Sequence, residues 1–138
     1  MGPVMRVETI DERLLQESEL ISIVWEREFR DLVFNLEGLW LPGQQMPSYG
    51  QPARLILRNC LWADFQQKQS FAENTYERDR HSLTMLSWHD GDPSTVPTEV
   101  RPALAQGYRV VEFISEETLN YPWLSAVCRE IDLTLLPA

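Results

Sequence analysis

The chain has 138 residues, of which 43% are hydrophobic and 24% are charged, values typical of a single globular domain spanning residues 1–138. Its net charge of −9 argues against binding to nucleic-acid phosphates or to anionic lipid head groups, because both repel an acidic chain. No apolar run approaches the roughly 20 residues that a membrane-spanning helix needs. We therefore expect an acidic protein that binds neither nucleic acid nor membrane.

Residues 8–19 come first and predict a short helix. Ile10, Leu14 and Leu15 stand at helical spacing, and Thr9 or Asp11 can cap the helix at its start. A helix of two or three turns is marginal by itself, so it would depend on packing against the rest of the domain.

The next stretch, residues 20–36, alternates apolar and polar positions in two runs separated by the charged segment 26–31. The alternating positions are Ile21, Ile23 and Trp25 in the first run, and Leu32, Phe34 and Leu36 in the second. This period of two predicts a β-hairpin, and Gly38 closes it. A single helix is the rival, because a second set of apolar residues also fits helical spacing: Phe29, Leu32, Val33 and Leu36.

The middle of the chain combines a predicted loop with short strands. Residues 43–52 contain two Gly and two Pro and are predicted to be a loop, and residues 53–65 are predicted to form two short strands with a turn at Asn59. Residues 66–81 are polar, so both a loop and one short helix stay open. A further strand is predicted over residues 82–89.

The C-terminal part has the clearest strand pattern. Residues 90–107 contain three prolines and are predicted to be a linker, and strands are predicted over 108–115 and 127–136 with a turn region between them. The predicted fold class is mainly β, as an antiparallel sheet or a small β-sandwich of about six to eight strands with one or two short helices. An α+β arrangement is the alternative.

Two cysteines, Cys60 and Cys128, lie in strand-like segments. The start of the chain is acidic and lacks the apolar stretch of a secretory signal, so a cytoplasmic location is expected. In that compartment two buried, reduced thiols are favoured over a long-range disulfide, although the sequence does not settle the pairing.

His89, Asp90 and Asp92 form the one cluster that could hold a metal ion and support a small metal-dependent hydrolase. The same segment contains Asp-Gly followed by Pro93, which is more typical of a turn. His81 lies too far along the predicted strand to share a metal with His89. We therefore expect no metal, no cofactor and no catalytic site.

An acidic cluster with aromatic neighbours is the best candidate for a binding surface. Carboxylates gather at the predicted hairpin turn, and large aromatic side chains next to proline or the turn resemble the anchors of protein interfaces. The candidate partner-binding residues are Glu26, Glu28, Phe29, Asp31, Trp40 and Trp123. Such a surface favours a basic protein partner, and self-association as a homodimer through an exposed sheet edge is a further alternative.

The strand patterns of residues 53–65, 108–115 and 127–136 resemble those of a group of small bacterial all-β proteins of unknown function. Some of these proteins are grouped with the immunity proteins of polymorphic toxin systems. The resemblance implies a protein that binds and neutralises a cognate toxin, and it transfers no functional residue. The expected function is therefore non-enzymatic binding of a protein partner.

Overall fold

The computed structural model describes residues 4–6, 15, 18–39, 45, 48–65, 83–115 and 122–136. The described part of the chain contains nine β-strands and two short 3-10 helices. In chain order they are β1 (Val4–Arg6), β2 (Ser18–Glu26), β3 (Asp31–Leu39), β4 (Ser48–Arg58), β5 (Trp62–Phe65), β6 (Leu83–Asp90), η2 (Pro93–Thr95), η3 (Arg101–Gln106), β7 (Arg109–Ser115), β8 (Leu124–Cys128) and β9 (Glu130–Leu135). The predicted mainly-β, antiparallel fold class is confirmed, with nine strands where six to eight were expected.

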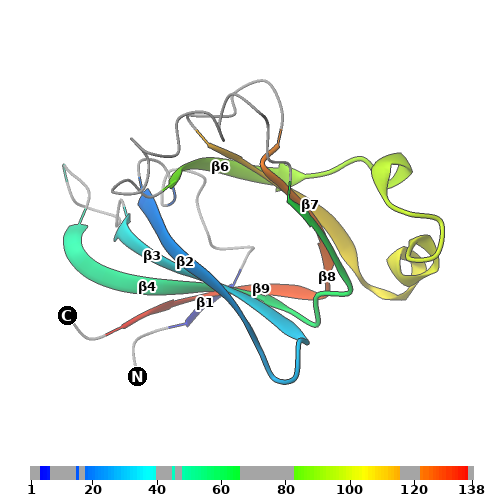
Figure 1. The fold of residues 1–138 in the computed structure, drawn as a ribbon, viewed down its shortest axis with the longest axis horizontal. Coiled ribbons are helices and arrows are strands. Elements are labelled where there is room, and N and C mark those ends of the chain that lie inside the picture. The colour runs from blue at the N-terminus through cyan, green and yellow to red at the C-terminus, as the bar shows by residue number, and fades with distance from the viewer. Residues whose placement is uncertain are drawn as a thin grey trace.

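The strands form one antiparallel sheet that folds over into two layers (Figure 1). The order across the sheet is β1-β9-β4-β3-β2-β6-β7-β8-β5. The first five strands in this order make one layer and the last four make the other. The layers are joined by a short stretch of antiparallel pairing between β2 and β6, in which Ser18 faces Met85 and Leu20 faces Leu83.

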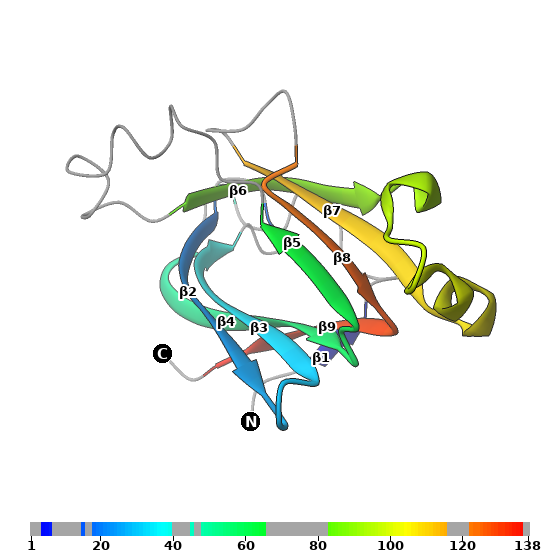
Figure 2. The same ribbon diagram turned by 45° about the vertical axis from the view of Figure 1, so that its right-hand side comes forward.

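The layers are also joined where two strand pairs bend from one layer into the other (Figure 2). The chain passes from β4 into β5 through a turn at Asn59, which has a φ of 50°, and from β8 into β9 at Arg129. The Arg129 N–H donates to the Arg58 carbonyl at 2.9 Å, and the Leu61 N–H donates to the Val127 carbonyl at 2.9 Å. The β4–β9 pair of one layer therefore continues as the β5–β8 pair of the other.

The core fills the space between the layers, because each central strand turns alternate side chains inward. Three aromatic rings meet there from both layers. Phe34 on β3 lies 5.4 Å from Phe113 on β7 and 5.8 Å from Trp123, measured between ring centroids. Further fully buried side chains surround these rings: Leu15, Leu32, Leu36, Leu39, Leu55, Leu57, Leu124 and Ile131.

The predicted hairpin is confirmed, since β2 and β3 pair along their length around the turn at residues 27–30. Gly38 was expected to end the second strand, but β3 continues to Leu39. Gly38 has a φ of 80° and lies at a register shift in the β3–β4 pair, between Glu37 and Leu39. Glycine adopts this left-handed conformation without strain, so the strand bulges there instead of stopping.

Several other predicted boundaries differ from the observed ones. The predicted loop 43–52 is wrong in its second half, because β4 already begins at Ser48. The predicted turn region after β7 gives way to β8 at Leu124, and the predicted strand 127–136 is divided at Arg129 between β8 and β9.

Most of the predicted helix 8–19 and the whole segment 66–81 fall outside the described residues. Ser18 and Glu19, at the end of the predicted helix, belong to β2.

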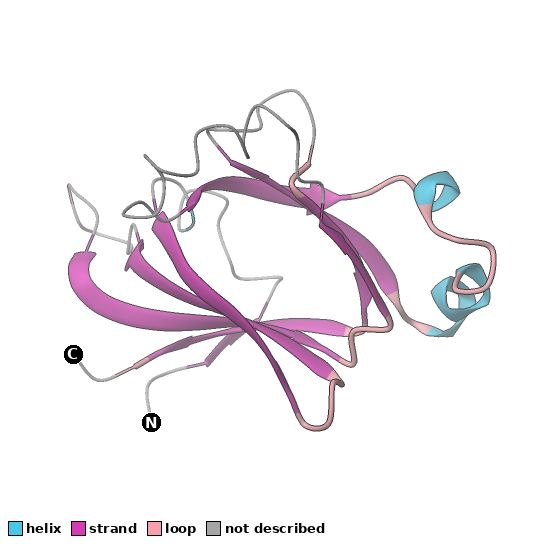
Figure 3. Ribbon diagram, in the orientation of Figure 1, coloured by secondary structure: helices cyan, strands magenta, loops and turns pink. Residues whose placement is uncertain are grey.

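The predicted linker 90–107 is an ordered segment that contains η2 and η3 and lies at one end of the molecule (Figure 3). Val96, between the two helices, is buried against Val110 and Val127 on the sheet. Gly107 follows η3 with a φ of 93°, a value that favours glycine, and its N–H donates to the Ala103 carbonyl. Prolines in this segment therefore accompany short helical turns that pack on the sheet.

Candidate partner-binding surface

The turn between β2 and β3 has an unusual backbone. Arg27, Glu28 and Phe29 have φ values of 51°, 58° and 67°, so three consecutive non-glycine residues are left-handed. The Arg30 N–H closes the turn by donating to the carbonyls of Glu26 at 3.1 Å and Arg27 at 3.2 Å. A left-handed residue with a β-carbon costs about 1–2 kcal/mol, so the surrounding structure must hold this turn in place.

Asp31 is the group that holds the turn, and its side chain is only 2% exposed. Arg27 donates to both carboxylate oxygens, with Nε at 2.7 Å from Oδ2 and Nη2 at 2.9 Å from Oδ1. Arg58 Nη1 donates at 3.0 Å, and the backbone N–H of Asn59 donates at 3.1 Å. We call Asp31 with these three partners the Asp31 anchor.

The electrostatics of the Asp31 anchor favour the ionised carboxylate. The hydrogen bond from Arg27, together with those from the Asn59 N–H and Arg58, lowers the pKa of Asp31 to about 2, although burial acts in the opposite direction. A carboxylate that accepts several charged and backbone donors is stabilised most in its charged form. The turn is therefore braced by a charge that persists throughout the physiological pH range.

The anchor also connects the turn to the bend between β4 and β5. Arg27 Nη2 donates to Oδ1 of Asn59 at 3.1 Å, and the N–H of Cys60 donates to the Arg30 carbonyl at 2.6 Å. Arg58 reaches in the other direction as well, since its Nε donates to Asp132 on β9 at 3.0 Å. The turn is therefore connected to the bend between β4 and β5 and, through Arg58, to β9.

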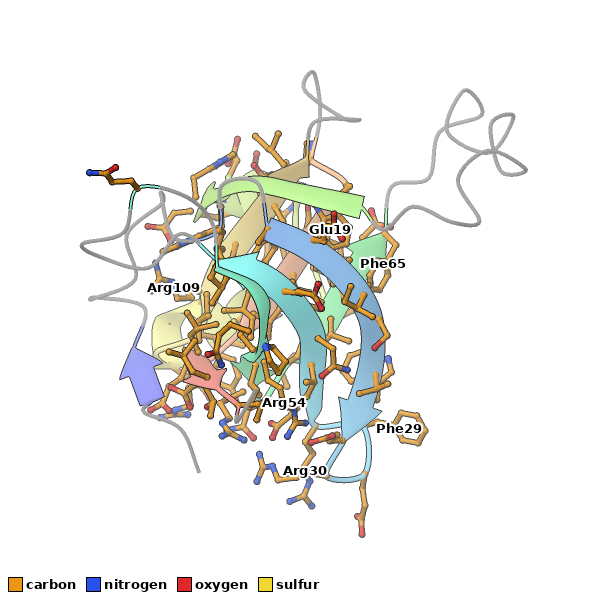
Figure 4. The ribbon with its side chains drawn as sticks, turned by 90° about the vertical axis from the view of Figure 1, so that its left-hand side faces the viewer. Glu19, Phe29, Arg30, Arg54, Phe65 and Arg109 are labelled. Atoms are coloured by element: carbon orange, nitrogen blue, oxygen red, sulfur yellow. The ribbon has the colours of Figure 1, made fainter. Side chains whose placement is uncertain are left out.

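Exposed apolar side chains lie at this braced turn and along the strand that leads to it. The Phe29 side chain is 76% exposed and projects from the end of the hairpin (Figure 4), and its ring centroid lies 6.4 Å from that of Trp25. Ile21, Val24 and Trp25 on β2 are 55%, 39% and 39% exposed, with Val24 on the opposite face of the sheet from Trp25. We call these four residues the β2 aromatic edge.

The strand that carries this edge is only partly paired. β2 pairs with β3 along its length, but in the described parts of the chain its pairing with β6 covers residues 18–20 and not residues 21–26. One side of the β2 backbone beyond Leu20 is thus free of a strand partner within those parts. An unpaired strand edge with apolar side chains is a template for pairing with another chain.

The charges around the turn are largely balanced, which changes the acidic cluster expected from sequence. Glu26 forms an ion pair with Arg54, with Oε2 and Nη2 2.5 Å apart, and Asp31 is buried between Arg27 and Arg58. Glu28 is exposed. The surface is therefore an aromatic edge flanked by paired charges, not a concentrated acidic patch.

The six residues predicted from sequence thus fall in different places. Glu26, Glu28 and Phe29 lie together at the surface of the turn, whereas Asp31 is buried in the Asp31 anchor. Trp123 is 5% exposed and lies in the core, 6.2 Å from Phe113 between ring centroids, so it is not a surface anchor. Trp40 lies outside the described residues. Sequence reasoning missed Ile21, Val24 and Trp25 as exposed residues. Trp25 shares the core side of the sheet with Leu32, and it is exposed because β6 stops pairing with β2 at Leu20.

The three residues of the alternative metal site, His89, Asp90 and Asp92, each interact with a different neighbouring residue. His89 Nε2 lies 2.8 Å from Glu112 Oε1, Asp90 pairs with Arg109, and Asp92 accepts a hydrogen bond from the Ser94 N–H at 2.9 Å, where it caps η2. Among the described residues there is no group of three or more His, Cys, Asp or Glu side chains arranged to hold a metal ion. The segment forms the turn that its Asp-Gly and Pro residues predict.

Comparisons of the chain with protein-family models, with curated proteins and with solved structures give no match. In the described part of the chain, no helix has the length and apolar character to cross a membrane.

Proposed function

We propose that this protein acts in the cytosol by binding a protein partner through the β2 aromatic edge. One observation carries the proposal: three consecutive left-handed residues, held by the Asp31 anchor, present a Phe29 side chain that is 76% exposed. Strained backbone that the surrounding structure holds in place is concentrated at functional sites. An exposed aromatic pair on a preorganised turn has the properties of an interface hot spot.

The partner that suits this surface offers an extended segment with apolar side chains. Residues 21–26 can accept such a segment as an added strand, which gains main-chain hydrogen bonds while Trp25 and Phe29 contact its side chains. The net charge of −9 attracts a basic partner over distance and accelerates the encounter. Neutralisation of a basic toxin, as the resemblance to immunity-type proteins implies, is the most specific form of this proposal.

Affinity capture with matched variants tests the proposal. The immobilised wild-type protein is compared with Phe29→Ser and with Leu61→Ser, a control at a 52% exposed apolar residue on the segment between β4 and β5. We expect a partner that the wild type and Leu61→Ser retain and that Phe29→Ser loses, with affinity reduced at least about 30-fold, as for a hot-spot residue. Equal urea midpoints for the three proteins show that folding is unchanged.

Two outcomes would overturn the proposal. One is capture that is equal for the wild type and Phe29→Ser, and the other is no capture of any partner even at about 50 mM salt, where electrostatic attraction is strongest. A single captured species whose binding weakens with salt supports a basic partner. Sedimentation of the wild type at two concentrations distinguishes self-association through β2, which would give a dimer in place of a heterologous complex.

A further inference from the structure

The two cysteines lie at the two bends that join the layers. Cys60 lies between β4 and β5, and Cys128 is the last residue of β8, directly before the bend into β9. The hydrogen bonds from Arg129 to Arg58 and from Leu61 to Val127 bracket this region on both chains. Between these two hydrogen bonds, the β8–β9 segment contains only Cys128, and the β4–β5 segment contains only Asn59 and Cys60. The cysteines are therefore cross-strand neighbours.

Both side chains lie in the same buried core. Cys60 and Cys128 belong to one buried cluster, with exposures of 6% and 0%, and both are free cysteines. Disulfides span Cα separations of about 4.4–6.8 Å, a range that includes the roughly 4.5–5.5 Å between facing residues of antiparallel strands and leaves room for the extra residue at this bend. Burial is the main cause of the raised pKa of Cys128, and the nearby Cys60 raises it further.

We propose that Cys60 and Cys128 are a redox pair that forms an intramolecular disulfide when the protein meets a peroxide. One thiolate attacks the peroxide oxygen to give a sulfenic acid, and one molecule of water leaves after proton transfer. The second thiolate then attacks the sulfenic sulfur, and a second water leaves as the S–S bond forms. Two thiols lose two electrons and two protons, and hydrogen peroxide is reduced to two molecules of water. Excess dithiol reduces the S–S bond back to two thiols by thiol–disulfide exchange and is itself oxidised to a disulfide.

Burial determines how this pair responds. Desolvation raises the pKa of Cys60 to about 11 and that of Cys128 to about 12, so few thiolates exist at neutral pH and the reaction is slow in the folded protein. The rate should rise about tenfold per pH unit between about pH 7 and pH 9, whereas that of an exposed thiol would level off near its ordinary pKa of about 8.5. The disulfide should therefore form only during sustained exposure to peroxide, or when the bends open transiently and expose the thiols.

The bond would act on the candidate binding surface as well as on stability. The Cys60 N–H donates to the Arg30 carbonyl, so a link to Cys128 fixes the backbone that supports the β2–β3 turn. It also closes a long covalent loop in the unfolded chain, which favours the folded state. For a domain of this length, the expected rise in melting temperature is roughly 10 °C. This inference does not depend on the proposed function.

The test uses the reduced wild-type protein treated with hydrogen peroxide. We expect both free thiols to disappear, the monomer to lose two hydrogens in mass, and non-reducing tryptic digests to contain peptide 59–68 linked to peptide 110–129. The melting temperature should rise and return to its original value with dithiothreitol. Cys60→Ser and Cys128→Ser should form no such link and show no rise.

Several outcomes of this experiment would contradict the proposed disulfide. Disulfide-linked dimers as the main product, oxidation to sulfinic acid without the linked peptides, or two thiols that persist even in mild denaturant would each overturn the proposal. So would an oxidised monomer that melts at or below the temperature of the reduced protein, because a bond that fits the native positions of the two cysteines should stabilise the folded state.

Discussion

Replacing Asp31 by Asn tests whether the charge of the Asp31 anchor stabilises the fold. Asparagine has the shape of the protonated carboxyl, so the substitution removes the charge with little change in packing. The pKa of Asp31 falls from 3.8 to about 2 on folding. At 1.36 kcal/mol per pH unit, this difference corresponds to about 2 kcal/mol of stability at neutral pH. Urea unfolding at about pH 7 should therefore show a midpoint lower by roughly 1 M.

The stabilisation by Asp31 should depend on pH in a direction that follows from its lowered pKa. A carboxyl whose pKa is lower in the folded state stabilises the protein above its unfolded pKa, and this stabilisation is lost as the pH falls from about 4 towards 2. The difference between the wild type and Asp31→Asn should thus shrink to below about 1 kcal/mol near pH 2.5. Asp90→Asn is the matched control: Asp90 is 70% exposed and pairs with Arg109 at the surface, so its loss should cost under about 0.5 kcal/mol. A difference that is constant with pH, or equal in both variants, would refute the reasoning.

Three further predictions concern the turn and the core. Phe29→Ser should change the free energy of unfolding by less than about 0.5 kcal/mol, because the side chain is 76% exposed, and a larger loss in urea unfolding would give Phe29 a structural role. Glu28→Gly should stabilise the protein by about 1 kcal/mol by relieving a φ of 58°, whereas Glu99→Gly, at an exposed residue with an ordinary negative φ, should not stabilise it. Phe113→Ala should cost about 3–5 kcal/mol and alter the fluorescence of Trp123, and a loss under about 1 kcal/mol would contradict the packing described for the core.

The strands could be predicted where one face of a segment is buried. Leu32, Phe34 and Leu36 alternate with residues on the other side of β3, and the β-branched and aromatic content of the segment, together with the early Gly38, favoured the hairpin over the rival helix. Bulges and bends were harder to foresee. Gly38 was interpreted as a stop, and the C-terminal segment as one strand, because pairing on both sides decides whether a strand continues through an irregular residue.

The candidate site depends on contacts between segments that are distant in sequence. Asp31 resembles a surface acid in a charged turn, but Arg58 and Asn59 from β4 and the bend after it surround it. Trp25 faces Leu32 across the hairpin and so shares the core side of the sheet, yet it is 39% exposed because β6 pairs with β2 only near Leu20. No local pattern carries this information. The exposed aromatic pair therefore became visible only once the order of strands was known.

The position of β9 has a consequence for how the chain folds during synthesis. β9 lies between β1 and β4, where Thr134 faces Val4 on one side and Arg54 on the other. Until residues 130–135 have left the ribosome, β4 has no neighbour on that side and the aromatic core lacks Ile131 and Leu133. Pairing across such long stretches of sequence is slow, with folding times of milliseconds to seconds. The nascent chain therefore exposes an apolar β4 edge until translation has passed β9, and this interval is when it is most open to aggregation or to a chaperone.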